Sequence, residues 1–304
     1  MTSATTLHHV PVTDGHVAAF DGGEGHGPPL VLLHGGGLDH RSWEPQARAL
    51  RRAHRVIALD LRGHGASSTP KAPFRHADDV AAVLDALDAA PAVLAGVSMG
   101  ASAAVDLAVT RPEAVAGVVA VGAGAGGPEF RDPWTLGVLA AQDEAARAGD
   151  APAWVEAFLR FAAGPSRSLD DVDEAVVALL RECVTSTLAR HVAAGPPVLP
   201  EWAEDAAGRA RHLTVPVLAV VGEEDSADHA RQAAELVAPL PQGRLVTVPG
   251  AAHYPHLERP AAVEAALTRF LDDLGEEPPG GLIPPGRRAA RPRSGRRREG
   301  RGSD

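Results

Sequence analysis

Two kinds of apolar pattern alternate along most of this chain. Short and almost wholly apolar runs predict buried strands, and longer stretches with apolar residues every three or four positions predict helices. The expected strands are 7–12, 16–21, 29–33, 55–60, 92–97, 115–121, 215–221 and 244–248, and the expected helices are 45–51, 76–89, 101–109, 227–237 and 260–274. The first two strands read as an antiparallel pair. Apolar strands that alternate with helices predict an α/β fold, with a mostly parallel sheet covered on both faces.

The alternation stops between residues 128 and 208, where every periodic stretch indicates a helix. Asp132 stands directly before Pro133, Asp150 stands two positions before Pro152, and 168–171 resembles a capping box. All three are typical of helix starts. This segment holds six of the eleven aromatic residues of the chain, namely Phe130, Trp134, Trp154, Phe158, Phe161 and Trp202. We expect a helical cap at 128–208 on a core formed by 1–127 and 209–275. The aromatic residues would form the apolar face of the cap helices, and some would line a pocket over the sheet.

The charge is distributed unevenly along the chain. The net charge is −10, but residues 281–304 carry eight arginines and two acids, so the preceding 280 residues carry −16. An acidic body argues against nucleic acid as a partner. The segment 276–304 is rich in proline, glycine and arginine, a composition that predicts disorder. A basic tail of this kind is more often solvated than bound to a partner.

Cysteine usage and the N-terminus bear on the compartment. The single Cys183 has no partner for an internal disulfide and no metal-binding spacing, so we expect a buried structural thiol. Residues 1–10 lack the features of a signal peptide, and no apolar run reaches the ~20 residues of a membrane span. The expected location is cytoplasmic. The oligomeric state cannot be read from the sequence.

A candidate nucleophile lies between a predicted strand and a predicted helix. Residues 96–100 read Gly-Val-Ser-Met-Gly, a G-x-S-x-G motif centred on Ser98. A tight turn in that context lifts the serine hydroxyl above the sheet edge, and small residues two positions on either side avoid a clash. The motif alone also occurs in ordinary turns between a strand and a helix. Its placement after one element and before the other is what favours a nucleophile.

Three other strand ends carry groups that acyl transfer needs. The loop 34–37 reads His-Gly-Gly-Gly, and the backbone N–H groups of Gly36 and Met99 are candidates for an oxyanion hole. Asp225 follows a late strand, and we favour it over its neighbours Glu223 and Glu224 as the residue that orients a base. His253 follows the last strand, and we favour it over His256 as that base. The chain order Ser98, Asp225, His253 is the order of the α/β-hydrolase triad.

On these residues the chain resembles the α/β-hydrolase superfamily, in its capped esterase, lactonase and cofactor-free haloperoxidase-like branch. The matching stretches cover most of 7–274 and are 34–38, 42–44, 60–67, 96–100, 222–225 and 250–253. The Asp-x-Arg-Gly-His-Gly-x-Ser stretch at 60–67 is highly specific to the family. The resemblance implies an eight-stranded sheet with a helical cap, a structural rather than catalytic His64, no metal and no organic cofactor.

The resemblance implies a serine hydrolase that cleaves a carboxylic ester or lactone through an acyl-Ser98. We expect an apolar small-molecule substrate, with Gly37, Trp43, Trp134 and Phe158 as candidate contacts. Family members with Asp at the nucleophile position are epoxide hydrolases or dehalogenases, so Ser98 disfavours those activities. A carbon–carbon bond hydrolase, a perhydrolase-like enzyme and a non-catalytic binding protein remain alternatives on the same fold. A dinucleotide-binding protein is a further alternative, because 122–127 contains G-x-G-x-x-G, although prolines rather than a helix follow it.

Overall fold

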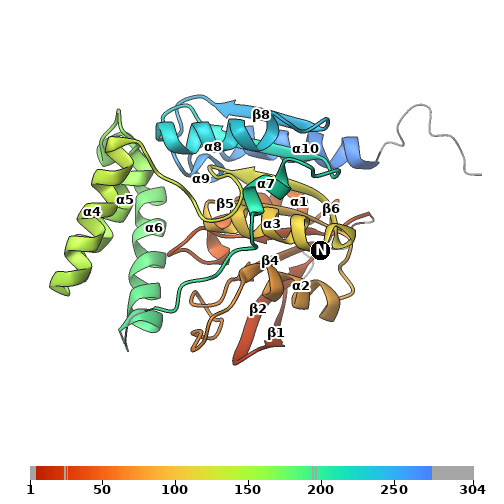
Figure 1. Cartoon of the computed structure of the whole chain (residues 1–304), viewed down its shortest axis with the longest axis horizontal. Coiled ribbons are helices and arrows are strands. Elements are labelled where there is room, and N and C mark those ends of the chain that lie inside the picture. Colours follow the sequence, from red (N-terminus) through yellow and green to blue (C-terminus); the bar gives the residue numbers. More distant parts are fainter. Residues whose placement is uncertain (1–4, 24, 26, 194, 196, 276–304) are drawn as a thin grey trace, which may run out of the picture.

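A single eight-stranded sheet forms the centre of the molecule (Figure 1). The computed structural model describes residues 5–275 except 24, 26, 194 and 196, so the predicted disorder of 276–304 falls outside the described residues. The sheet order is β1-β2-β4-β3-β5-β6-β7-β8. The strands are β1 Thr6–Val12, β2 Gly15–Gly22, β3 Leu30–Leu33, β4 Val56–Asp60, β5 Ala92–Val97, β6 Val115–Val121, β7 Val217–Gly222 and β8 Gly243–Val248.

The pairing of the strands confirms the predicted mostly parallel sheet. Strand β2 runs antiparallel to β1 and to β4, and every other pairing in the sheet is parallel. The carboxyl ends of β3, β5, β6, β7 and β8 therefore meet along one edge of the sheet. The loops that follow these strands carry the predicted site residues, so the fold itself gathers them.

Helices cover both faces of the sheet, as predicted. Alternate residues of a strand point to opposite faces, so Val31 and Leu33 of β3 enter one apolar core while Leu30 and Leu32 enter the other. The first core packs under α2 His76–Ala86, α3 Met99–Thr110, α7 Ala206–Ala210 and α8 Ala227–Val237. The second packs under α1 Glu44–Leu50, α9 Pro255–Glu258 and α10 Pro260–Gly275. Short turns η1 His40–Trp43 and η2 Pro112–Ala114 lead into α1 and β6.

The segment between β6 and β7 is helical. It contains α4 Pro133–Ala148, α5 Ala151–Ala163, η3 Leu169–Asp171, α6 Glu174–Thr187 and η4 Leu188–Val192, and Figure 1 shows α4, α5 and α6 grouped beyond one end of the sheet. Asp132 and Asp150 cap the first turns of α4 and α5, and Ser168 with Asp171 forms a capping box. The final helix of the segment, α7, packs instead on α3 of the core. The division of the chain at 128 and 208 stays a prediction.

Cys183 is a buried free thiol in α6, as predicted, and burial raises its pKa to about 12. A thiol with that pKa stays protonated at neutral pH, so it is a poor nucleophile.

In the part of the chain that the structure describes, no helix combines the length and the apolar character needed to cross a membrane.

Candidate active site

Ser98 forms a strained turn between β5 and α3. Its backbone has φ 52° and ψ −117°, a positive φ that residues other than glycine rarely adopt. Its N–H donates to the carbonyl of Val121 at 2.8 Å, which ties the turn to the end of β6. A Cβ on Gly96 would lie 2.3 Å from the Gly100 carbonyl oxygen, and one on Gly100 would lie 2.3 Å from that of Leu33. The two glycines therefore allow the close approach that holds Ser98 in this conformation.

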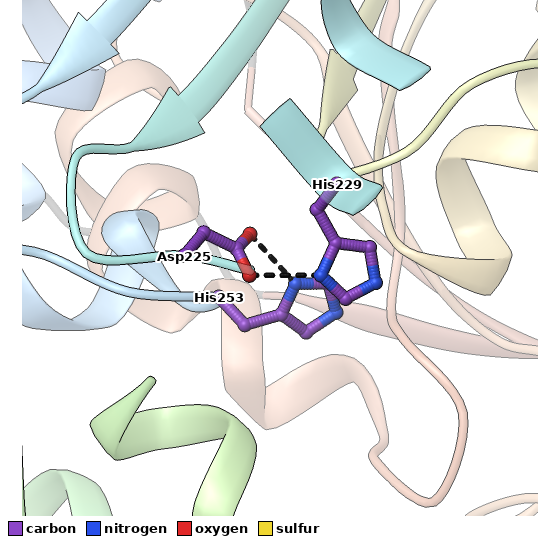
Figure 2. A group of neighbouring side chains, drawn as sticks. All are labelled: Asp225, His229 and His253. Carbon is purple, nitrogen blue, oxygen red and sulfur yellow. Dashed lines mark hydrogen bonds and ion pairs between the residues drawn. The ribbon is translucent and has the colours of Figure 1, made fainter. Parts of the chain in front are cut away.

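Asp225 and His253 meet because β7 and β8 are neighbours in the sheet. His253 Nδ1 lies 3.0 Å from Asp225 Oδ2, and both side chains are buried (Figure 2). A carboxylate accepts hydrogen bonds, so Nδ1 carries the proton and Nε2 of the neutral ring has a free lone pair. This pairing has the geometry of an oriented general base.

The rivals of these two residues have other partners. Glu223 accepts the N–H of Gly250, and the Glu224 carboxylate accepts the Ser166 hydroxyl. Both ring nitrogens of the buried His256 lack a partner among the described residues, and its ring packs against Trp43 with centroids 4.5 Å apart. Of the candidate acids and bases, the geometry supports Asp225 and His253.

Burial and charge shape the ionisation of this pair. Burial alone would raise the pKa of the Asp225 carboxyl, but the two histidines that face it, His253 and His229, bring that pKa below its ordinary value. Burial lowers the pKa of His253, and the neighbouring His229 lowers it further, while Asp225 opposes both effects. At neutral pH the carboxylate is therefore ionised and the His253 imidazole is neutral, which is the state a general base requires.

The loop after β3 lies beside the nucleophile turn. A Cβ on Gly35 would lie 3.5 Å from Ser98 Cβ, and one on Gly36 would lie 4.0 Å from Met99 Sδ. Met99 is the first residue of α3, so its N–H has no acceptor inside the helix. The buried ring of His34 anchors the loop, since its Nε2 accepts the N–H of Leu61 at 2.9 Å. Gly36 and Met99, the two candidates for an oxyanion hole, therefore lie in the same region as Ser98.

Helix α5 brings aromatic side chains against this loop and against His253. Phe158 lies so close to Gly37 that a Cβ there would be 3.3 Å from its ring. The ring of Phe161 lies 5.6 Å from that of His253, and Trp134 of α4 meets Phe161 edge-on at 5.7 Å. Phe158, Trp134 and Gly37 are thus positioned near the site.

Trp43 has a different environment from the other predicted contacts. It is fully buried, and its indole N–H donates to the Leu33 carbonyl at 3.0 Å. This placement gives Trp43 a packing role, and we leave it out of the substrate contacts that we propose. The nearby Asp39 and His40 are engaged by Arg41 and by Asp60 respectively.

The site contains one residue that the sequence analysis missed. His229, in the first turn of α8, places Nδ1 2.8 Å from Asp225 Oδ1 (Figure 2). It stands four positions after Asp225, a spacing that brings two side chains together on a helical turn. That spacing was the available signal, but no motif marks it.

Two groups of side chains have donor atoms spaced for a metal ion among the described residues. They are Asp225 with His229 and His253, and Asp39 with His40 and Asp60, each with ligand atoms within 4.8 Å of one another. In the first group the two imidazoles donate to the carboxylate. In the second, Asp39 binds Arg41 and Asp60 binds His40. Hydrogen bonds and ion pairs account for both arrangements.

The glycine-rich stretch 122–127 does not have the setting of a dinucleotide site. It follows β6, but α4 begins at Pro133 rather than directly after the glycines. Gly122 instead lies against the catalytic candidates, since a Cβ there would be 2.9 Å from His253 Nδ1. The stretch connects the sheet to the helical segment.

Comparisons with known proteins agree with this architecture. The family model described as "alpha/beta hydrolase fold" matches residues 28–260. The chain is 32% identical over 267 residues to the dihydrolipoyllysine-residue acetyltransferase component of the acetoin cleaving system of Pseudomonas putida, covering 82% of this chain and 65% of that protein. It is 30% identical over 271 residues to the pimeloyl-[acyl-carrier protein] methyl ester esterase of Xylella fastidiosa, covering 82% of this chain and 97% of the relative.

Solved structures give the same result. The esterase RhEst1 from Rhodococcus sp. ECU1013 has a TM-score of 0.74 at 27% identity, covering 90% of this chain and all (100%) of that one. The enol-lactonase from Burkholderia xenovorans LB400 has a TM-score of 0.69 at 25% identity, covering 87% of this chain and 100% of that one. With the sheet order and the family match over most of its length, the chain belongs to the α/β-hydrolase fold family.

Proposed function

We propose that the protein is a serine hydrolase that cleaves a carboxylic ester or lactone through an acyl-enzyme. The observation that carries the proposal is the strained Ser98 turn on the same sheet edge as the buried Asp225–His253 pair. The similarity to an esterase and to an enol-lactonase supports the same reaction class.

In the first step of the proposed reaction, Ser98 Oγ attacks the substrate carbonyl carbon. His253 Nε2 takes the hydroxyl proton, while Asp225 holds the opposite nitrogen and stabilises the imidazolium. The carbonyl oxygen becomes an oxyanion, and the N–H groups of Gly36 and Met99 donate to it. Preorganised donors of this kind stabilise the charge that develops in the transition state.

The second step releases the alcohol and then the acid. The imidazolium gives its proton to the leaving oxygen, and the ester bond breaks to leave an acyl group on Ser98. His253 then removes a proton from a water molecule, which attacks the acyl carbon. The bond from the acyl carbon to Ser98 Oγ breaks, and the imidazolium returns the proton to Oγ. In a lactone the leaving oxygen belongs to the same chain as the acyl group, so it stays attached and water releases a single hydroxy acid.

The side chains around the site favour an uncharged, apolar acyl group. In α5, Phe158 lies against Gly37 of the loop 34–37, which we call the oxyanion loop, and Phe161 lies against His253. Two arginines join the helical segment to the rest of the fold, and both are paired with acids. Arg41 is paired with Asp39 and Glu182, and Arg167 is paired with Glu258. Apolar walls with few converging polar groups are typical of small-molecule sites.

The test is Ser98→Ala on a short p-nitrophenyl ester and on a panel of esters and lactones of graded chain length. We expect kcat/KM to fall by roughly 10³-fold or more with an unchanged thermal unfolding midpoint. A fluorophosphonate probe should label the wild type and leave Ser98→Ala unlabelled. Ser102→Ala, one turn farther along α3, is the matched control and should retain activity. Wild-type rates in Ser98→Ala would rule out the proposed nucleophile.

A further inference from the structure

One carboxylate binds two imidazoles in this site. Asp225 Oδ2 lies 3.0 Å from His253 Nδ1, and Oδ1 lies 2.8 Å from His229 Nδ1. Figure 2 shows both rings turning Nδ1 toward the carboxylate and Nε2 away from it. The reaction proposed above uses His253 and leaves His229 without a role.

The hydrogen bond fixes the tautomer of His229. An ionised carboxylate only accepts, so an approach of 2.8 Å requires a proton on Nδ1. Ser226 completes the arrangement, because its backbone N–H donates to Asp225 Oδ1 at 2.7 Å and its hydroxyl lies 3.0 Å from His229 Nδ1. Neutral His229 and neutral His253 therefore share the same tautomer.

Helix α8 and its neighbours fix the position of the His229 ring. Ser226 caps the helix through the N–H of His229, so the ring lies in the first turn and faces back toward Asp225. The side chain is buried, with the rings of Phe130 and Phe161 5.7 Å and 5.9 Å away. Its ring is stacked on that of His253, with centroids 4.0 Å apart and planes 22° from parallel. His229 thus touches both members of the acid–base pair, Asp225 and His253.

We propose that His229 is a positioning residue of this site, which orients Asp225 through Nδ1–H and restricts the tilt and the protonation of His253 through the stacked ring. The inference rests on the proposed function, because it assigns His253 as the base. It adds a second imidazole to the acid–base unit, bound to the same carboxylate as His253.

The electrostatics follow from the groups that surround the two rings. Asp225 attracts a proton to either imidazole, and a proton on one ring opposes a proton on the other across 4.0 Å. Asp228 of the same helix is already paired with Arg231, and Tyr254 meets the His253 ring edge-on. Removing the His229 ring removes the repulsion and leaves the attraction, so it should make His253 easier to protonate. The acid limb of kcat/KM should then move to higher pH.

Two variants separate the hydrogen bond from the ring. His229→Asn places an amide N–H where Nδ1 stands and cannot take a charge, whereas His229→Leu removes both. In His229→Leu we expect kcat/KM to fall roughly 10- to 100-fold, the range for a lost hydrogen bond to a charged group. In His229→Asn we expect a pH-optimum rate within about threefold of wild type and an acid limb at higher pH. Gln232→Leu, one turn farther along α8, controls for disturbance of the helix and should leave both rate and pH profile unchanged.

A second readout does not depend on turnover. In the wild type, proton NMR should show two downfield imidazole N–H signals, one for each hydrogen bond to Asp225, and His229→Asn should lose one of them. Wild-type kcat/KM in His229→Leu, an unmoved acid limb in His229→Asn, or a single downfield signal in the wild type would overturn the inference. If Ser98→Ala retains activity the proposed reaction fails, but the NMR signals still test the shared carboxylate.

Discussion

His64 Nε2 accepts the backbone N–H of Gly37 at 2.9 Å. The other ring nitrogen, Nδ1, lies 3.2 Å from the Arg62 carbonyl and donates to it. The ring thus bridges the loop after β4 to the glycine-rich loop after β3. Burial lowers the pKa of His64 to about 3, so Nε2 remains an acceptor at neutral pH. The resemblance implies a structural role for His64. The hydrogen bond shows that His64 holds the glycine-rich loop 34–37 at Gly37, the residue after Gly36.

Replacing this acceptor should weaken catalysis more than folding. In His64→Phe the Gly37 N–H loses its partner, and a lost hydrogen bond of about 1.4 kcal/mol in the transition state corresponds to a roughly tenfold fall in kcat/KM. We expect the fall in kcat rather than in KM, because the oxyanion forms only in the transition state. His64→Gln offers a side-chain oxygen near the same place and should recover most of the rate. Equal rates in His64→Phe and wild type would contradict a link between this ring and the oxyanion loop.

Gly122 offers a test of the Asp225–His253 geometry without changing either residue. Its φ is +61°, and a Cβ there would lie 2.9 Å from His253 Nδ1 and 3.3 Å from Asp225 Oδ2. Gly122→Ala should therefore displace the pair and lower kcat/KM at least tenfold, since small misplacements of catalytic groups are costly. It should also lower the free energy of unfolding by about 1 kcal/mol, because alanine resists a positive φ.

Gly149→Ala is the matched control for that variant. Gly149 ends α4 with φ +68°, and a Cβ there would meet nothing within 4 Å. Alanine at this position carries the same backbone cost, which urea unfolding can measure, without a clash at the site. We expect a similar loss of stability and an unchanged kcat/KM. Parallel losses of activity in both variants would show that backbone strain, and not displacement of His253, is responsible.

The sheet and the triad candidates were predictable because their signals are local. Buried parallel strands such as β5 are wholly apolar, and the turn at Ser98 needs glycine on both sides. Since each candidate follows a strand, the parallel order of the sheet was enough to bring them to one edge. The predicted start of a helix at residue 101 was two residues late, because α3 begins at Met99, directly after the Ser98 turn.

His229 and Trp43 show where local signals end. His229 stands among polar residues in a helical first turn, a pattern typical of a solvated surface, yet it is buried. Its burial depends on how α8 packs beside the loop after β8, and the sequence near His229 does not encode that packing. Trp43 follows the glycine-rich loop, which suggested a pocket, but the η1 turn directs its indole to the Leu33 carbonyl.

The buried histidines also predict how stability depends on pH. Burial lowers the pKa of His256 to about 3, below its ordinary value of 6.5. Below pH 6.5 the unfolded chain binds a proton at this residue that the folded chain does not, so acid favours unfolding. The contribution of neutral His256 to the free energy of unfolding is present in full above about pH 6.5. It is lost progressively as the pH falls to about 3.

His256→Leu should flatten this dependence. One such group costs the wild type about 2 kcal/mol between pH 7.5 and 5, at ~1.4 kcal/mol per pH unit below the unfolded pKa. Neither ring nitrogen of His256 has a partner among the described residues, so leucine removes no hydrogen bond from the side chain. Urea unfolding at several pH values measures the difference. Leu257→Ala, at the adjacent position in α9, should lower stability equally at every pH because it changes no titrating group. Equal pH slopes in wild type and His256→Leu would show that His256 already accepts its proton in the folded state.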